Sequence, residues 1–219
     1  MAKKLLNPVK GILFGLFAIS RTTPCFVTTP CKKENLVLIN RFFCGILPLH
    51  FSIPMLVQHN LAYILLGGNL GNVPQHLQRT IELLQQRAGT IRMLSPVYRS
   101  EAWGFKADTF FLNQVVALDT DLTPEKLLEE LMDIEKQMGR QRNATGYQSR
   151  VMDIDILFYN NQIIHSQTLT VPHPRLHLRN FTLKPLNDIA PTWQHPVLGK
   201  TIAELLHICS DPLWAEPVS

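Results

Sequence analysis

The sequence predicts an α+β fold in which two helices pack on one face of an antiparallel sheet. Three observations indicate it: apolar runs of strand length, amphipathic segments of helix length, and the order in which the two alternate between residues 61 and 159. That order is β-α-β-β-α-β, which is the ferredoxin-like, or split β-α-β, arrangement. A C-terminal hairpin and a short helix are expected to follow this core.

The predicted elements are separated by glycine, proline and asparagine. In chain order they are a strand over 61–66, a helix over 72–88, strands over 91–99 and 110–118, a helix over 123–138, a strand over 150–159, a hairpin strand over 162–165, a short apolar segment over 181–186 and a helix over 201–209. Asn72 and Thr123 are candidate N-caps, and a proline lies close behind each. Gly89 and Gly139 follow the ends of these helices, where glycine is common.

The strand over 150–159 places two carboxylates on one face. Side chains in a strand alternate between its faces, so Asp153 and Asp155 point the same way and the apolar residues beside them point into the core. Neighbouring carboxylates repel each other unless a cation joins them, and Mg²⁺ carrying substrate phosphates meets that need. An Asp-x-Asp sequence taken alone is more often a solvated polar face of an edge strand.

A polar loop rich in arginine leads directly into this strand. Arg140, Arg142 and Arg150 are close in sequence to the two aspartates, and guanidinium groups bind phosphate oxygens through paired hydrogen bonds. The loop and strand together therefore predict a polyphosphate site. The alternative is that the arginines only neutralise nearby carboxylates in surface ion pairs, which contribute little.

Aromatic and amide side chains supply candidates for binding a flat heterocycle. Phe110, Phe111 and Phe181 supply rings between which it could stack while Asn113 binds its polar edge. Each aromatic residue taken separately is more often part of the core. His173, between two prolines, could contact a phosphate or cap a turn, and Trp103 could belong to a lid or anchor its loop.

The first part of the chain differs from the rest. Residues 1–60 hold seven of the 21 lysines and arginines but one of the 17 acidic residues, so the remaining chain is slightly acidic. This charge balance argues against a nucleic-acid-binding surface on the body of the protein. Cys209 is the single cysteine beyond residue 60, which gives neither a disulfide framework nor a zinc spacing and fits a reducing compartment.

Residues 1–54 allow three interpretations. Lys3 and Lys4 before an apolar run over 11–19 resemble a weak signal peptide, although the run is too short to span a bilayer. A basic transit peptide is the second, and a true translation start at Met55 is the third and the one we favour. We therefore expect an extension over 1–54 and one domain over 55–219 that acts as a cytoplasmic monomer without a membrane partner.

A set of short motifs follows in order from residue 67. They are Gly67-Gly-Asn-Leu, Tyr98-Arg-Ser-Glu-Ala-Trp-Gly104, Phe111-Leu-Asn113, Glu135 with Gly139-Arg140, Arg150-x-x-Asp153-Ile-Asp155-Ile-Leu, Val171-Pro-His-Pro174 and Arg179-Asn-Phe181. As a set they resemble the 6-hydroxymethyl-7,8-dihydropterin pyrophosphokinase family of folate biosynthesis, over about residue 61 to the C-terminus. Residues 1–54 have no counterpart in that resemblance.

The resemblance implies an enzyme that transfers pyrophosphate from ATP to the pterin hydroxymethyl group and releases AMP. It implies that Asp153 and Asp155 hold two Mg²⁺ ions and that Arg140 and Arg150 join them as catalytic residues. The implied ATP-binding residues are Glu135, Arg140, Arg142, Arg150, Ile156, His173 and Arg179. The implied pterin-binding residues are Ser100, Trp103, Phe111, Asn113, Tyr147 and Phe181. The loops over 100–108 and 140–149 are expected to close over the site.

The sequence departs from the family pattern at two places. Gly146-Tyr147-Gln-Ser-Arg150 stands where many members have Trp-Gly-Pro-Arg, and Thr168 stands where some have an arginine. Two other classes share single features with this chain. An RNA-binding or regulatory domain can have the same element order. The acidic body, and the absence of paired exposed aromatics flanked by Lys or Arg on the second and third strands, argue against RNA. An Asp-x-Asp nucleotide-sugar transferase usually needs a larger α/β domain.

Overall fold

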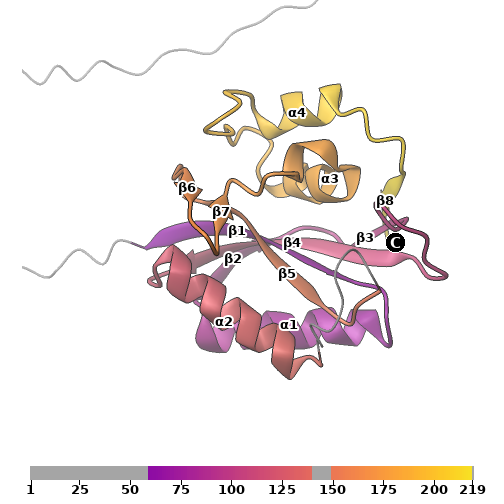
Figure 1. Ribbon diagram of the computed structural model, residues 1–219, viewed down its shortest axis with the longest axis horizontal. Helices are drawn as coiled ribbons and strands as arrows, with labels where there is room; N and C mark the ends of the chain where they lie inside the picture. The colour runs from indigo at the N-terminus through magenta and orange to yellow at the C-terminus, as the bar shows by residue number, and fades with distance from the viewer. Residues whose placement is uncertain (1–58, 140–148, 219) are drawn as a thin grey trace, which may run out of the picture. The chain divides into compact units, whose positions relative to one another are not determined.

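The computed structural model describes residues 59–139 and 149–218 (Figure 1). The expected extension over 1–54 and the predicted site residues Arg140, Arg142 and Tyr147 lie outside them. The strands are β1 (Asn60–Gly68), β2 (Thr90–Leu94), β3 (Tyr98–Ser100), β4 (Phe111–Thr120), β5 (Asp153–Tyr159), β6 (Ile164–His165), β7 (Thr170–Val171) and β8 (Ala215–Pro217). The helices are α1 (Val73–Arg87), α2 (Pro124–Gln137), the 3-10 turn η1 (Leu176–Leu178), α3 (Asn180–Ile189) and α4 (Ile202–Ile208).

An antiparallel sheet forms the centre of the fold. Its strands follow the order β5-β1-β4-β3-β8, and β2 pairs with β4 beside β3. β6 and β7 form a separate two-stranded sheet, so the predicted hairpin strand is present. This mixed α/β fold with an antiparallel sheet agrees with the fold class that the sequence predicts.

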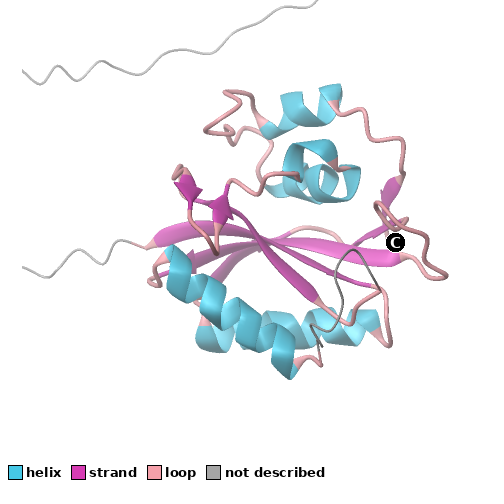
Figure 2. Ribbon diagram, viewed as in Figure 1, coloured by secondary structure: helices cyan, strands magenta, loops and turns pink. Residues whose placement is uncertain are grey.

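Helices cover both faces of the sheet. Figures 1 and 2 show α1 and α2 on one face, as predicted, and α3 and α4 on the other. The prediction of a short apolar segment over 181–186 was incomplete, because this stretch lies within the helix α3. Two features hide that helix in the sequence: Pro185 lies inside it, and its N-cap residue Arg179 makes no side-chain capping hydrogen bond.

The helix boundaries follow the predicted capping residues. The Asn72 side chain accepts a hydrogen bond from the backbone N–H of Gln75 at 3.3 Å. The Thr123 hydroxyl accepts one from the backbone N–H of Lys126 at 3.4 Å. Gly89 follows α1 with φ at 151°, and a Cβ there would lie 2.1 Å from the carbonyl oxygen of Asp119, so no other residue fits.

The strand predicted over 91–99 is two strands, β2 and β3, and this prediction was wrong. Pro96 lies between them and has no N–H to donate. Ser95 turns the chain instead: its N–H donates to the carbonyl of Val115 at 2.9 Å, and its hydroxyl accepts the N–H of Val115 at 2.9 Å. The edge strand β8, which pairs with β3, was not predicted because three residues give no measurable alternation.

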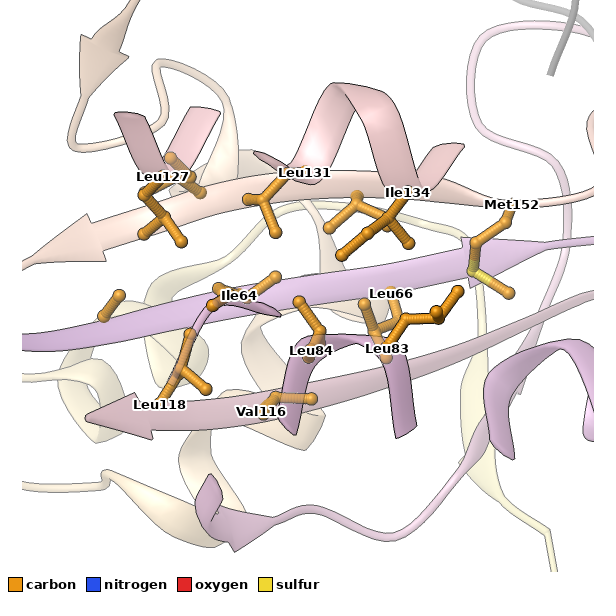
Figure 3. Packing of buried hydrophobic residues seen from close by; sticks show 14 of the residues in the cluster. Ile64, Leu66, Leu83, Leu84, Val116, Leu118, Leu127, Leu131, Ile134 and Met152 are labelled. Carbon is orange, nitrogen blue, oxygen red and sulfur yellow. The ribbon is translucent and has the colours of Figure 1, made fainter. Parts of the chain in front are cut away.

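Apolar side chains pack on both faces of the sheet. Figure 3 shows Leu127, Leu131 and Ile134 of α2 facing Ile64 and Leu66 of β1. The second cluster lies between the opposite face and the helices α3 and α4. Leu65 and Phe181, which belong to or pack against this second cluster, also line the cavity described next, so the cavity lies on the second face.

Candidate active site

A cavity of about 350 Å³ lies over the sheet on the face that carries α3. It is lined by β1, β3, β4, β5, the loop after β3, the segment before η1 and the start of α3. The lining residues are Leu65, Gly67, Ser100, Glu101, Trp103, Phe105, Phe111, Asn113, Arg150, Asp153, Asp155, His173, Pro174, Arg175, Arg179 and Phe181. The cavity thus brings together residues that are up to 116 positions apart, from Leu65 to Phe181.

Most of the predicted site residues meet in this one cavity. Those that line it are Ser100, Trp103, Phe111, Asn113, Arg150, Asp153, Asp155, His173, Arg179 and Phe181. Ile156 does not: its side chain is buried in the core on the opposite face of β5, which is the alternation that places the two aspartates in the cavity. If Ile156 contributes to ATP binding as predicted, its side chain does not do so by lining the cavity.

Glu135 also lies behind the cavity and does not line it. Its buried carboxylate, on α2, accepts a hydrogen bond from the backbone N–H of Ile154 at 2.8 Å. Ile154 is the residue between the two aspartates, so this bond ties the Asp-x-Asp strand to the helix. Glu135 thereby supports the position of both carboxylates from the core side.

Strand register sets Asp153 and Asp155 beside β1. Gly67 pairs with Asp153 on one side and with Asn113 on the other, and Leu65 pairs with Asp155. A Cβ at Gly67 would lie 3.0 Å from Asn113 Oδ1, so glycine keeps the floor of the cavity low between the amide and the carboxylate.

Arg150 contacts the first carboxylate of the pair. Its Nη1 lies 2.5 Å from Asp153 Oδ2, and the two side chains are 17% and 24% exposed. The alternative interpretation, that arginines neutralise the aspartates, is thus partly realised at Arg150. The pair lies inside the cavity and not on the outer surface. A polyphosphate bound in the cavity could therefore contact the guanidinium.

The two carboxylates of the cavity fit an Mg²⁺ ion that binds together with a substrate phosphate. Among residues 59–139 and 149–218 no group of three or more His, Cys, Asp or Glu side chains is placed to hold a metal ion. Mg²⁺ is commonly bound by one or two carboxylates, with phosphate oxygens and water completing its coordination. Asp153 and Asp155 supply that number of carboxylates.

His173 presents a hydrogen-bond donor to the cavity. Its Nδ1 accepts the backbone N–H of Arg175 at 3.2 Å, so in the neutral ring the hydrogen is on Nε2. Burial, together with the positive charge of Arg179, lowers the pKa of His173 to about 4. The ring is therefore neutral at physiological pH, and it is a poor general base but a competent donor to a phosphate oxygen.

Aromatic rings surround Arg179 and Phe111. The Arg179 guanidinium lies 4.4 Å from the ring centroid of Trp103 and 5.4 Å from that of Phe181. Phe105 meets Phe111 edge to face at 6.0 Å. Burial lowers the pKa of Arg179, and the nearby Asp155 and Asp153 charges oppose that shift, so the guanidinium stays charged beside the carboxylates.

Asn113 is held in a fixed orientation. Its amide Nδ2 donates to the Ser100 hydroxyl at 2.9 Å, and both side chains are buried. Its Oδ1 is the atom that closely approaches Gly67. A ligand with adjacent donors and acceptors can therefore meet a preset amide rather than one that must reorient.

Asn69 links three segments around the cavity. Its side-chain Nδ2 donates to the hydroxyls of Thr109 at 3.1 Å and Ser149 at 2.9 Å, and its Oδ1 accepts the N–H of Arg150 at 2.8 Å. The turn after β1 thus joins the loop before β4 to the segment that carries Arg150.

Sequence reasoning missed several lining residues. Glu101 and Phe105 belong to an irregular loop without periodicity, and Arg175 lies on an irregular segment next to His173. The adjacency of Arg175 to the Pro-His-Pro motif was a usable signal. Leu65 could be found only from strand register, and Gly67 was named as part of a motif but given no role in the site. In the described residues, none of the helices is long and apolar enough to cross a membrane.

Comparison with known proteins identifies the family. A family model described as 7,8-dihydro-6-hydroxymethylpterin-pyrophosphokinase (HPPK) matches residues 63–191. The 2-amino-4-hydroxy-6-hydroxymethyldihydropteridine pyrophosphokinase of Porphyromonas gingivalis is 40% identical over 139 residues, which cover 62% of this chain and 94% of that protein. The Bacillus subtilis protein of the same name is 39% identical over 132 residues, covering 60% and 78%.

A solved structure agrees in fold. Plasmodium falciparum HPPK-DHPS with SDX-DHP superposes with a TM-score of 0.56 at 20% identity, over 68% of this chain and 44% of that one. The chain thus spans less than half of that structure, and the likeness concerns the fold alone. By its similarity to these relatives, the protein is an enzyme of the diphosphotransferase class. It belongs to the HPPK family, which confirms the resemblance seen in the sequence motifs.

Proposed function

We propose that the protein transfers the β,γ-pyrophosphate of ATP to the hydroxymethyl group of 6-hydroxymethyl-7,8-dihydropterin in folate biosynthesis, giving the pterin diphosphate and AMP. The observation that carries this proposal is the shared cavity. It is lined both by a carboxylate pair with cationic side chains and by aromatic rings with a preset amide. A polyphosphate and a flat heterocycle can therefore bind in contact with each other, which transfer between them requires.

The residues proposed to bind the triphosphate are the charged residues of the cavity. Arg150 and Arg179 supply guanidinium groups, and the Nε2–H of His173 supplies a neutral donor. Asp153 and Asp155 would hold two Mg²⁺ ions, which when bound neutralise phosphate charge and orient the attacking and leaving oxygens. Arg140 and Arg142 are proposed to complete this set from outside the described residues, as the sequence resemblance implies.

The residues proposed to bind the pterin are the aromatic and amide side chains. Phe111 and Phe181 are proposed to stack on the ring, and Asn113, held by Ser100, is proposed to bind its polar edge. Trp103 would border the same part of the cavity. Tyr147, outside the described residues, is proposed to contribute from the second loop.

We propose further that the core has the ferredoxin-like arrangement, which the strand order β5-β1-β4-β3 supports. We also propose that the enzyme acts as a cytoplasmic monomer on small-molecule substrates, without a nucleic-acid or membrane partner.

The test is a product analysis with ATP, the reduced hydroxymethyl pterin and Mg²⁺. We expect AMP and pterin diphosphate to form in equal amounts, with little AMP in the absence of pterin and none after chelation of the metal. ADP with a pterin monophosphate would instead show transfer of a single phosphoryl group and overturn the proposal. Consumption of ATP without a phosphorylated pterin would show a hydrolase and overturn it equally.

A further inference from the structure

The C-terminal segment contacts both ends of the loop that borders the cavity. Trp214 lies beyond residues 63–191, which the family model matches. Its indole N–H donates to Glu101 Oε1 at 2.7 Å, and its ring centroid lies 5.3 Å from that of Phe110. Glu101 and Phe110 are the first and last residues between β3 and β4, so one indole joins the two stems of this loop.

Arg99 completes this contact from the middle of β3. Its guanidinium lies 5.3 Å from the ring centroids of both Phe110 and Trp214, and its Nη2 lies 2.6 Å from Glu216 Oε1. A cation next to two rings and a carboxylate makes an interlocked cluster rather than a single contact. We name Arg99, Glu101, Phe110 and Trp214 the stem cluster.

The segment that carries Trp214 is itself firmly attached to the fold. Ala215 pairs with Ser100 in the β3–β8 ladder, and its carbonyl accepts a hydrogen bond from Lys184 Nζ at 2.8 Å. Just before it, Asp211 accepts the backbone N–H of Asn180, at the start of α3, at 2.8 Å. Trp214 is therefore a fixed point on the sheet edge against which the loop is held.

The middle of the loop reaches the cavity. Trp103 stacks on Arg179 at 4.4 Å and Phe105 meets Phe111 at 6.0 Å, and all four line the cavity. A loop of this length can place two such side chains reproducibly only if its stems are fixed, because each unfixed backbone residue adds conformational freedom. The stem cluster fixes them, and Asn69 holds Thr109 near the end of the same loop through a separate hydrogen bond.

We propose that Trp214 is a positioning residue for pterin binding. Through its hydrogen bond to Glu101 and its contact with Phe110, it fixes the loop 101–110 and so places Trp103 and Phe105 at the cavity. This inference rests on the proposed function only in naming the pterin as the ligand affected. Its structural part, the restraint of the loop by the C-terminal segment, holds for any ligand of the cavity.

Cleavage by trypsin after Lys106 tests the restraint without a substrate. Lys106 is exposed in the middle of the loop, and cleavage there requires local opening. Trp214→Phe keeps an aromatic ring but removes the N–H donor, and we expect about fivefold faster cleavage, the size of effect that one lost hydrogen bond allows. Trp193→Phe is the matched control, because the Trp193 Nε1 has no hydrogen-bond partner within residues 59–139 and 149–218 and its ring packs 5.0 Å from Tyr63.

Two variants at Glu101 test the bond from its other end. Glu101→Gln keeps an oxygen that accepts the indole N–H and should keep the parent cleavage rate, whereas Glu101→Leu should cleave as fast as Trp214→Phe. Combining Glu101→Leu with Trp214→Phe should add little, because both remove the same interaction. Parent-like cleavage in both Trp214→Phe and Glu101→Leu, or equal acceleration in Trp193→Phe, would overturn the proposal.

Steady-state kinetics test the positioning. For Trp214→Phe we expect the KM for the pterin to rise about fivefold and the KM for ATP to rise less. Phe105 contacts the aromatic Phe111, and the loop reaches a proposed phosphate-binding residue only through the contact of Trp103 with Arg179. Faster cleavage with an unchanged pterin KM would overturn the positioning role. If the parent enzyme forms no pterin diphosphate, the proposed function fails, while the cleavage rates still decide whether Trp214 restrains the loop.

Discussion

Asp153 and Asp155 are chemically alike but differ in their surroundings. Arg150 contacts Asp153 at 2.5 Å, while Asp155 lies opposite Leu65 of β1 and contributes to the charge around Arg179. If both hold Mg²⁺, Asp153→Asn or Asp155→Asn keeps size and shape but removes a charged ligand. We expect each to slow the chemical step by about 10²–10³, the typical cost of one displaced catalytic electrostatic group, in single-turnover measurements across a Mg²⁺ titration.

The control for these variants is pterin binding without nucleotide, which should stay at the parent value because the carboxylates are proposed to act on phosphates. Thermal melts without metal check that each variant is folded. Parent-like turnover of both variants at low Mg²⁺ would remove the metal assignment and leave a polar strand face paired with Arg150.

The proposed pterin clamp gives a second expectation. Phe111→Ala and Phe181→Ala should each weaken pterin binding by on the order of 1 kcal/mol beyond the loss of buried area, with a much smaller effect on nucleotide affinity, as titration calorimetry would measure. Phe181 also packs against the second core cluster. Its variant therefore needs a melting curve beside the titration, and Phe111→Ala is the sharper test. Equal weakening of both ligands in a folded variant would mean that the rings do not clamp the pterin.

Individual site residues were predictable where a local rule applied. Strand alternation was enough to place Asp153 and Asp155 on one face and Ile156 in the core. The family resemblance implies that Ile156 binds ATP, and the same alternation means that its side chain does not line the cavity. Glu101 and Phe105 obey no such rule, because an irregular loop brings them to the cavity.

The turn between α3 and α4 depends on a buried histidine. His195 Nδ1 accepts the backbone N–H groups of Val197 at 3.3 Å and Leu198 at 3.2 Å, which requires an unprotonated nitrogen. Burial, with a smaller effect of the nearby His177, lowers the pKa of His195 below its usual 6.5. Folding therefore excludes a proton that the unfolded chain binds at mildly acidic pH.

The sign of the pH dependence follows from this shift. Above the unfolded pKa near 6.5 the contribution of His195 to stability is fully present, and it is lost as the pH falls through the lowered folded pKa. We expect the free energy of unfolding in urea to decrease from about pH 7 to about pH 5. His195→Asn, whose Oδ1 can accept the same N–H groups, should show a shallower decrease. An identical dependence of the unfolding free energy on pH in the parent and the variant would mean that His195 does not contribute to it. The lowered pKa of His173 affects both proteins alike and therefore cancels in the comparison.

Elements with strong local signals were predicted, and those that depend on distant partners were not. The capped helices α1 and α2 and the strands β1, β4 and β5 follow from periodicity and capping residues. A single proline, Pro96, interrupts the predicted strand and separates β2 from β3. The pairing of β8 with β3 joins segments that are more than a hundred residues apart in the sequence. The helix α3 was missed because its proline and weak cap contradict the helical pattern.

The two faces of the sheet have different tasks. The face covered by α1 and α2 is filled by apolar side chains, and Glu135 links it to the Asp-x-Asp strand. The opposite face carries the second core cluster under α3 and α4 and the cavity beyond it. One strand, β5, contributes to both, so changes in packing beneath it are expected to move the carboxylates as well.

Among the described residues, those that form the two core clusters and the cavity all follow Asn60 in the sequence. Strand β1 begins at Asn60, and two contacts hold its start in place. The N–H of Leu61 donates to Asn160 Oδ1 at 2.8 Å, and His59 Nδ1 lies 2.9 Å from Asp121 Oδ1. Both core clusters and the cavity consist of residues from Leu61 onward. We therefore predict that a chain beginning at Met55 folds with the parent's free energy of unfolding and retains the parent's kcat/KM.

Urea unfolding and steady-state kinetics of the two chains, side by side, test this prediction. A chain beginning at Leu66 is the matched control, because it removes Ala62 and Ile64, which are fully buried in the first core cluster, and should not unfold cooperatively. If the chain from Met55 unfolds at a lower urea concentration or loses its cooperative transition, residues 1–54 are part of the folded domain. If its stability matches the parent but kcat/KM falls, the extension acts on the site instead, since stability and activity would then depend on different parts of the chain.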